Sequence, residues 1–234
     1  MKNLLLASTS TVHGSDPLSY LFSELKIHFK GCKSVLFIPF ARPGGLSHDE
    51  YTTKVSDVFS KIDMEVIGLH SYTDMTTALN EAEAIFTGGG NTFVLLDQLY
   101  KNELIKPLQK VLNSGTPYLG TSAGTNICGQ TVGTTNDMPI IYPPSFEALK
   151  LIPFNINPHY LDPDPNSTHM GETRETRINE FHKFNSLHVL GLREGSFLKV
   201  HGNRIQLLGP HEARLFRQKE KAIEIKPSSY YPFT

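Results

Sequence analysis

The chain has 234 residues, of which 39% are hydrophobic and 19% are charged. This composition is typical of a globular protein and excludes both a disordered chain and a repetitive fibre. The 22 Lys and Arg residues nearly balance the 23 Asp and Glu residues, so the net charge is −1. Such a balance gives no basic surface for capturing nucleic acid or anionic lipid, and we expect neither a nucleic acid nor a membrane as a partner.

The two cysteines, Cys32 and Cys128, lie far apart in the sequence and form no CxxC pair. This usage predicts a reducing compartment, and it indicates neither a disulfide framework nor a zinc site. The apolar run near the N-terminus ends at Ser8 and is too short for a signal-peptide core or a membrane span. We therefore expect a cytoplasmic protein.

The first 130 residues alternate between short apolar runs and amphipathic segments. The apolar runs lack a polar alternation, which is typical of strands buried on both faces of a parallel sheet. Helix starts are indicated by a capping box over residues 47–50 and by Asp74, and a helix end is indicated by Gly115. The pattern predicts an α/β fold with a doubly wound, mostly parallel sheet and helices on both faces. The predicted strands are 4–7, 35–40, 64–69, 84–87 and 117–120, and the predicted helices are 51–62, 75–82, 91–100 and 104–112.

From Thr131 onward, closely spaced prolines interrupt the chain as far as Pro165 and exclude helix interior there. A helix is predicted again near residues 172–184, and a strand over 187–192. A C-terminal hairpin follows, with strands 197–200 and 204–208 around residues 201–203. No Ser/Gly linker or internal repeat divides the sequence, so we expect one domain over residues 1–234.

The segment from Gly120 to Gly124 matches the G-x-S-x-G pattern of a nucleophile elbow, with Ser122 at its centre. It follows a predicted buried strand and precedes helix-compatible residues, which is the context this motif requires. A sharp strand-to-helix turn crowds the backbone, so small residues must flank the serine. The alternative is an ordinary Gly/Ser turn, but the context favours Ser122 as a nucleophile.

A second glycine cluster, residues 88–90, also ends a predicted strand and precedes a helix. Backbone N–H groups of Gly89 or Gly90 could pair with that of Ala123 as an oxyanion hole. The rival interpretation is a nucleotide-binding loop. However, the glycine spacing breaks the dinucleotide fingerprint, and no Walker lysine follows.

A serine nucleophile needs a base and a carboxylate that fixes the base. Among the ten histidines, His159 is held by a preceding proline in a rigid, non-helical segment after the elbow, which favours it as the base. Asp137, in a polar turn, and Glu194, after an apolar strand, are the two candidates for the acid. Sites of open α/β sheets lie at the carboxyl ends of the strands, which favours Glu194 geometrically. The sequence leaves both open.

Metal-assisted chemistry is the main chemical alternative, because acidic residues and histidines are dense in the proline-rich segment. These residues match neither HExxH nor a comparable ligand spacing, and we predict no metal and no cofactor. They are His159, Asp162, Asp164, His169 and Glu172.

Seven short motifs, in order and over nearly the whole chain, resemble those of the peptidase E family of serine-type α-aspartyl dipeptidases. They are Phe37-Ile-Pro-Phe40, Gly88-Gly-Gly-Asn-Thr-Phe93, Ser122-Ala-Gly124, Thr134-Thr-Asn-Asp-Met-Pro-Ile140, Ile156-Asn-Pro-His159, Gly171-Glu-Thr-Arg174 and Gly191-Leu-Arg-Glu-Gly195. The resemblance implies a fold akin to class I glutamine amidotransferase domains, with serine in place of cysteine. It also implies hydrolysis of small dipeptides with an N-terminal aspartate.

The resemblance further implies that Ser122 is the nucleophile and His159 its base, with Asp137 or Glu194 as the acid. Arg174 suits this substrate, because a guanidinium can bind an aspartyl carboxylate with two hydrogen bonds. A surface arginine paired with Glu172 or Glu175 is the alternative for Arg174, and the resemblance favours the binding role.

Two other functions stay open at this point. One is a cyanophycinase-like peptidase that acts on β-aspartyl substrates, and the other is a non-catalytic, ligand-binding member of the fold. Retention of Ser122, His159 and both candidate acids argues against the second.

Overall fold

A seven-stranded sheet has the order β3-β2-β4-β5-β1-β8-β9, in which the five strands from β3 to β1 are parallel and an antiparallel hairpin of β8 and β9 follows beside β1. The computed structural model describes every residue except Pro165, Ser167, His169 and Thr234. The strands of this sheet are β1 (Asn3–Ala7), β2 (Ser34–Ile38), β3 (Glu65–Gly68), β4 (Ile85–Thr87), β5 (Tyr118–Thr121), β8 (Phe197–His201) and β9 (Arg204–Leu208).

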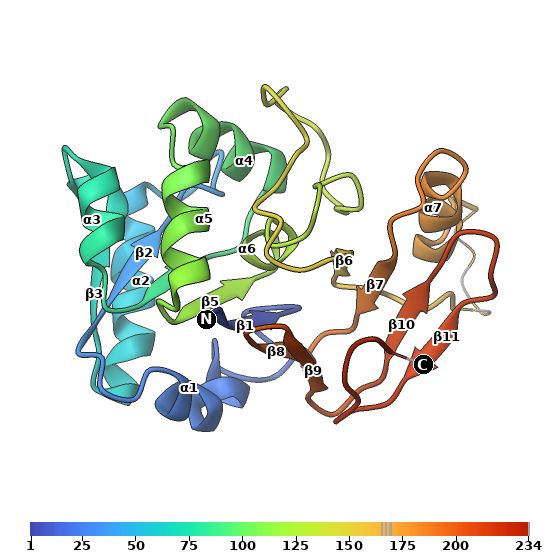
Figure 1. The fold of residues 1–234 in the computed structure, drawn as a ribbon, viewed down its shortest axis with the longest axis horizontal. Coiled ribbons are helices and arrows are strands. Elements are labelled where there is room, and N and C mark those ends of the chain that lie inside the picture. The colour runs from blue at the N-terminus through green and yellow to red at the C-terminus, as the bar shows by residue number, and fades with distance from the viewer. Residues whose placement is uncertain (165, 167, 169, 234) are drawn as a thin grey trace.

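Helices cover both faces of the sheet, as predicted (Figure 1). Along β1, Leu4 and Leu6 pack with side chains of α3, α4 and α5, whereas Leu5 and Ala7 pack with those of α1 and α2. Both faces are therefore apolar, and the absence of a polar alternation in the sequence follows from that. The α-helices are α1 (Phe22–His28), α2 (His48–Phe59), α3 (Met75–Glu81), α4 (Thr92–Lys101), α5 (Ile105–Ser114), α6 (Ala123–Asn126) and α7 (Arg174–Phe181). Short 3₁₀ turns occupy Ser19–Leu21, Ser60–Ile62 and Leu69–Ser71.

The predicted helix signals are confirmed. Ser47 and Glu50 form a reciprocal capping box at the start of α2, and Asp74 accepts a hydrogen bond from Thr77 N at the start of α3. Gly115 ends α5 with a φ of +119°, a conformation that favours glycine. The predicted C-terminal hairpin is also present, because β8 and β9 pair antiparallel around residues 202–203, and β8 extends the main sheet beside β1.

A second, four-stranded sheet with the order β11-β10-β7-β6 was not predicted. Its strand β6 lies within the proline-rich stretch, for which no strand was predicted. β6 pairs parallel with β7. Together with α7, this sheet forms the part of the molecule at the right of Figure 1. Its strands are β6 (Asn155–Pro158), β7 (Val189–Leu192), β10 (Ala213–Phe216) and β11 (Ile223–Ile225).

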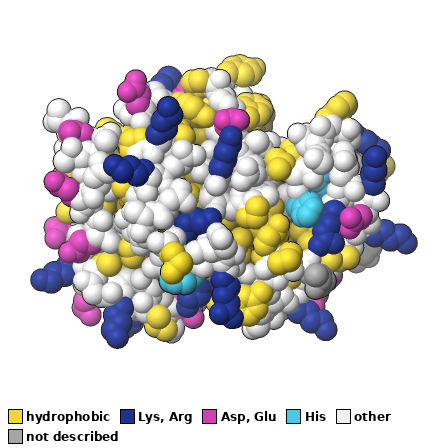
Figure 2. All heavy atoms as spheres, viewed as in Figure 1, with side chains coloured by type: hydrophobic (Ala, Val, Ile, Leu, Met, Phe, Trp, Pro, Cys, Tyr) yellow, Lys and Arg dark blue, Asp and Glu magenta, His cyan; other side chains and the backbone are white. Residues whose placement is uncertain are grey.

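One buried apolar cluster connects the two sheets. It contains Leu4 of the main sheet as well as Ile156 and Leu190 of the second sheet. Side chains of the two sheets therefore share one core, and the single domain stays a prediction. In the space-filling view, the outline is indented between the main α/β body and the part that contains α7, and charges of both signs are mixed over this face (Figure 2). Among the described residues, no helix combines the length and the apolar character needed to cross a bilayer.

Candidate active site

The candidate residues gather where strands of both sheets end. Ser122 follows β5, the glycines 88–90 follow β4, and His159 follows β6. Glu194 lies two residues beyond β7, the strand that pairs with β6. The unpredicted second sheet therefore carries two of these residues, and it places them beside the elbow of the main sheet.

Ser122 sits on a sharp turn between β5 and α6. Its φ of +53° and ψ of −111° are unfavourable for a residue with a side chain, as expected for a nucleophile elbow. A Cβ at Gly120 would lie 2.5 Å from the carbonyl oxygen of Gly124, and one at Gly124 would collide with the carbonyl of Thr87. The elbow therefore needs both flanking glycines, because other backbone passes through the space that a side chain would fill.

His159 contacts Ser122 through one ring nitrogen and Glu194 through the other. Its Nε2 lies 2.9 Å from Ser122 Oγ, and its Nδ1 lies 2.6 Å from Glu194 Oε1. The ring is less than half exposed, and the backbone of His159 has a φ of +53°. The structure thus brings Ser122, His159 and Glu194 into one hydrogen-bonded chain.

The tautomer of His159 follows from these contacts. An ionised carboxylate can only accept a hydrogen bond, so Nδ1 donates its proton to Glu194. Nε2 of the neutral ring is then an acceptor, and the Ser122 hydroxyl donates to it. This is the arrangement in which an imidazole can take a proton from a serine hydroxyl.

Asp137, the other candidate acid, lies at the start of α4. Its Oδ2 accepts a hydrogen bond of 2.7 Å from Thr92 N and one of 3.1 Å from Thr135 Oγ1. A carboxylate is stabilised at a helix N-terminus, where backbone N–H groups lack partners. Of the two candidates, Glu194 rather than Asp137 contacts His159 in the structure.

The glycine cluster lies directly beside the serine. A Cβ added to Gly89 would lie 3.0 Å from Ser122 Cβ and 3.5 Å from its Oγ. Gly90 has a φ of +148° and packs against the carbonyl group of Ala41. Ala123 N belongs to the first residue of α6, which has no acceptor within its own helix. The glycine cluster and the first residue of α6 thus flank Ser122.

Arg174, the first residue of α7, lines a cavity of about 380 Å³. Asn157, two residues before His159, lines the same cavity. The two carboxylates suggested as surface partners of Arg174 are bound by other arginines, since Glu172 pairs with Arg177 and Glu175 pairs with Arg214. The remaining lining residues are Gly133, Thr134, Thr135, Asn136, Ile178 and Phe181.

Ser8 is a site residue that sequence reasoning missed. Its fully buried hydroxyl donates to the carbonyl oxygen of Leu192 at 2.7 Å and accepts from His159 N at 2.8 Å. It follows β1, the strand next to β5, so its position at a strand end was the available signal. Tyr20 donates a hydrogen bond to the carbonyl oxygen of Thr9, next to Ser8 in the sequence. Burial of Tyr20, together with the charge of Glu194, raises the pKa of its hydroxyl.

In the described part of the chain, no group of three or more His, Cys, Asp or Glu side chains is arranged to hold a metal ion. His169, one of the residues considered for it, and Pro165 lie outside the described residues. Asp162 instead binds the guanidinium of Arg193.

A family model described as "Peptidase family S51" matches residues 4–208, a range that includes Ser122, His159 and Glu194. The chain belongs to peptidase family S51. A Drosophila melanogaster protein named "Probable alpha-aspartyl dipeptidase" is 49% identical over 229 residues, which cover 97% of this chain and 94% of the relative. "Peptidase E" of Streptomyces coelicolor is 49% identical over 227 residues, which cover 97% and 92%.

A solved structure confirms the fold of this S51 member. A peptidase from an acI-B1 Actinobacterium superposes with a TM-score of 0.74, at 16% identity and with 98% of this chain and 96% of that chain covered. Both the family membership and the α/β fold class agree with the expectations from the sequence.

Proposed function

We propose that this S51 member is a serine-type dipeptidase that hydrolyses dipeptides with an N-terminal aspartate. The observation that carries the proposal is the hydrogen-bonded chain Ser122–His159–Glu194. In this chain, the hydroxyl of Ser122, whose backbone is strained, is hydrogen-bonded to a histidine whose tautomer lets it accept the proton. The name of the Drosophila melanogaster relative, "Probable alpha-aspartyl dipeptidase", supports aspartate as the N-terminal residue of the substrate.

In the first half of the reaction, Ser122 Oγ attacks the peptide carbonyl carbon while His159 Nε2 takes the hydroxyl proton. The charge of Glu194, 2.6 Å from Nδ1, stabilises the imidazolium that forms. His159 then gives its proton to the leaving amine, and the aspartyl group stays on Ser122 as an ester.

The negative charge that develops on the carbonyl oxygen needs fixed donors. We assign these to the N–H groups of Gly89 or Gly90 and of Ala123, which flank Ser122 from two strand ends. In the second half, His159 activates a water that hydrolyses the ester, and the same N–H groups act again. Donors of this kind are each worth about 10²- to 10³-fold in kcat.

Arg174 is our proposed partner for the aspartyl carboxylate. It lines the cavity beside Asn157, and its two acidic neighbours on α7 are bound by Arg177 and Arg214. Arg174 has no carboxylate partner among the ion pairs of the described residues, and its guanidinium can form a two-pronged contact with a substrate carboxylate. The polar lining of the cavity, with two threonines and two asparagines, suits a small charged side chain better than an apolar one.

A substrate panel tests the proposal. Purified protein is assayed with Asp-Leu, Glu-Leu, Ala-Leu and a β-linked Asp-Arg dipeptide, by quantifying the released amino acids. The account predicts that Asp-Leu has the highest kcat/KM by a wide margin. Preference for the β-linked substrate would identify a β-aspartyl peptidase instead, and no turnover of any dipeptide would support a ligand-binding role.

We also place the protein in the cytoplasm, as a single domain that binds a small aspartyl dipeptide and neither nucleic acid nor a membrane. Both cysteines are free thiols, one of them buried, which suits a reducing compartment. Fractionation of the source cells, followed by immunoblotting, tests this placement.

A further inference from the structure

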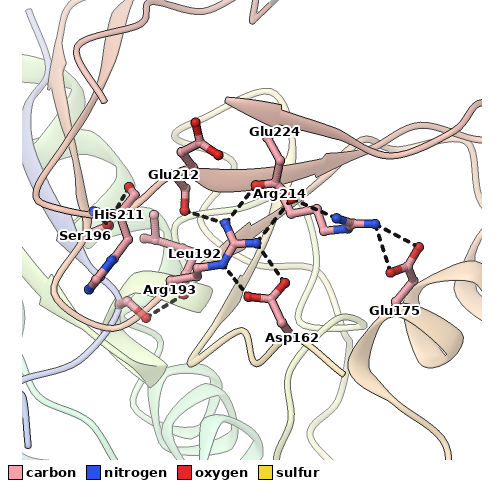
Figure 3. Close-up of polar contacts among 10 residues, drawn as sticks. Asp162, Glu175, Leu192, Arg193, Ser196, His211, Glu212, Arg214 and Glu224 are labelled. Carbon is pink, nitrogen blue, oxygen red and sulfur yellow. Dashed lines mark hydrogen bonds and ion pairs between the residues drawn. The ribbon is translucent and has the colours of Figure 1, made fainter. Parts of the chain in front are cut away.

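Glu194 lies in a short turn between β7 and β8, and this turn is held at both ends by one buried serine. The carbonyl oxygen of Leu192 accepts from Ser8 Oγ at 2.7 Å, and that of Ser196 accepts from Ser8 N at 3.1 Å. Ser196 Oγ also donates to the carbonyl oxygen of His211 at 2.9 Å (Figure 3). The backbone on either side of Glu194 is thus fixed.

The side chain of Arg193, the neighbour of Glu194, binds the segment that follows His159. Its Nε and Nη2 donate to the two carboxylate oxygens of Asp162 at 2.7 and 2.8 Å, a two-pronged contact (Figure 3). Asp162 is three residues after His159. The guanidinium also lies 5.6 Å from the ring centroid of Tyr160, in the same segment.

Arg193 is held on its other side by the second sheet. Its Nη1 donates to Glu224 Oε2 at 2.8 Å and to the carbonyl oxygen of Glu212 at 2.6 Å. Arg214 binds the same Glu224 and reaches Glu175 on α7, next to Arg174 (Figure 3). Arg193 is 18% exposed and Asp162 is 49% exposed, so solvent screens this contact less than it screens a pair of two fully exposed side chains.

The charges of the network are fixed over the working range of an enzyme. Hydrogen bonds from Arg193 lower the pKa of Asp162, and hydrogen bonds to Asp162 and Glu224 raise the pKa of Arg193. The planar guanidinium binds the carboxylate of Asp162 with two parallel hydrogen bonds, which fixes the relative orientation of the two groups. A lysine would keep the charge but not this two-pronged geometry.

We propose that Arg193 is a positioning residue that sets the contact between His159 and Glu194, through its clamp on Asp162. The turn that carries Glu194 and the segment that carries His159 are joined directly by the 2.6 Å hydrogen bond between those side chains. The ion pair between Arg193 and Asp162 is a second connection between the same two segments, one residue from Glu194 and three residues from His159. This inference rests on the proposed function only for the role of the His159–Glu194 pair.

The clamp is expected to act on kcat more than on KM. Arg193 lines neither of the two cavities that Arg174 lines, although its partner Asp162 lines one of them. The hydrogen bonds of Arg193 go to Asp162, Glu224 and the carbonyl oxygen of Glu212, and none of these residues is Ser122. A displacement of about 1 Å at a reacting group costs about 10²-fold in rate. Arg193 does not line the cavity of Arg174 and Asn157, so we expect KM to change little. The loss of a merely stabilising ion pair would instead lower the amount of folded enzyme and leave kcat per active site unchanged.

The test compares Arg193→Gln, Arg193→Lys and Arg217→Gln with the wild type. Arg217 is a matched control, since it lies one residue after β10 and is 25% exposed. Among the described residues, its guanidinium donates to Glu220 and to the carbonyl oxygen of Phe233. Two readouts are kcat and KM on Asp-Leu per folded enzyme. A third is the rate at which phenylmethylsulfonyl fluoride labels Ser122, which needs no peptide substrate.

For Arg193→Gln we expect kcat and the labelling rate to fall about 10- to 100-fold, with KM within about threefold of the wild type. Arg193→Lys is expected to recover part of the loss, because it keeps the charge but not the two-pronged contact. Arg217→Gln is expected to keep both rates. Equal rates for Arg193→Gln and Arg217→Gln would overturn the inference. Inactivity of the wild type on Asp-Leu would overturn the proposed substrate instead, and the labelling rates would still decide the role of Arg193.

Discussion

His159 Nδ1 lies 2.6 Å from Glu194 Oε1, although the two residues belong to different loops and are 35 positions apart. The contact exists because β6 and β7 pair side by side in parallel, so that their carboxyl ends carry both residues to the same place. Asp137 lies instead at the start of α4. We therefore expect substitution of Glu194 to lower kcat strongly and substitution of Asp137 to change kcat little.

Glu194→Gln is expected to lower kcat on Asp-Leu by about 10²- to 10⁴-fold, because a neutral amide cannot stabilise the imidazolium of His159. KM and the melting temperature are expected to change little, since Gln has the same shape and the site is nearly half exposed. Steady-state kinetics and thermal unfolding measure both quantities.

Asp137→Asn is the matched comparison. The amide oxygen can still accept from Thr92 N, so we expect kcat within about threefold of the wild type. The loss of charge at the helix N-terminus is expected to cost about 0.5–1 kcal/mol of stability. A large loss of kcat in this variant, with Glu194→Gln active, would reassign the acid to Asp137.

Gly89→Ala tests the space beside the nucleophile. The new methyl group would lie 3.0 Å from Ser122 Cβ and 3.5 Å from Oγ, where the tetrahedral intermediate must form. We expect kcat to fall at least about tenfold, even though the backbone donor remains. Gly44→Ala is the control, because a Cβ at Gly44 meets nothing within 4 Å. Unchanged kinetics for Gly89→Ala would remove this loop from the site.

Arg174→Gln is expected to raise KM for Asp-Leu. It is also expected to lower the ratio of kcat/KM on Asp-Leu to kcat/KM on Ala-Leu by roughly 10- to 100-fold, because that is what a charge-assisted hydrogen bond contributes to binding. Arg177 lines the same cavity but already binds Glu172 and Glu180, so Arg177→Gln is expected to leave the preference intact. Specificity ratios from competition assays separate the two variants. If Arg177→Gln alone abolished the preference, Arg177 would be the substrate's partner.

His28 predicts a loss of stability in mild acid. Burial lowers its pKa from 6.5 to about 4, and its Nε2 donates to the carbonyl oxygen of Tyr118. The unfolded chain therefore binds more protons than the folded chain between these values, and stability falls as the pH drops from 6.5 towards 4.

The size of this loss can be measured by urea unfolding at pH 7 and pH 5. His28 is expected to account for about 2 kcal/mol of the decrease in unfolding free energy between them. His28→Gln keeps a donor for Tyr118 O and has no titration, so its stability is expected to depend less on pH. An identical pH dependence in the two proteins would refute the assignment.

The sequence predicts the features that depend on neighbouring residues. The elbow at Ser122, the capping box at Ser47 and the Gly115 helix end each need only a few adjacent side chains, and local sterics dictate them. The buried parallel strands β1, β2, β4 and β5 are likewise evident, because both of their faces need apolar residues.

The remaining features depend on long-range pairing. β6 contains Pro158 and lies in a proline-rich stretch, so its pairing with β7 has no local signature. Without that pairing, the sequence cannot show that Glu194 reaches His159. Ser8 was missed for the same reason, since both of its side-chain partners lie more than 150 residues away.

The most direct test of the account is the hydrolysis of Asp-Leu by Ser122→Ala, beside the wild type. The variant removes only the hydroxyl that His159 Nε2 faces at 2.9 Å. We predict a wild-type circular dichroism spectrum, a kcat lower by about 10⁴-fold or more, and no covalent labelling by a serine-directed probe. A variant that cleaved Asp-Leu within tenfold of the wild-type rate would contradict the proposal that this serine carries the reaction.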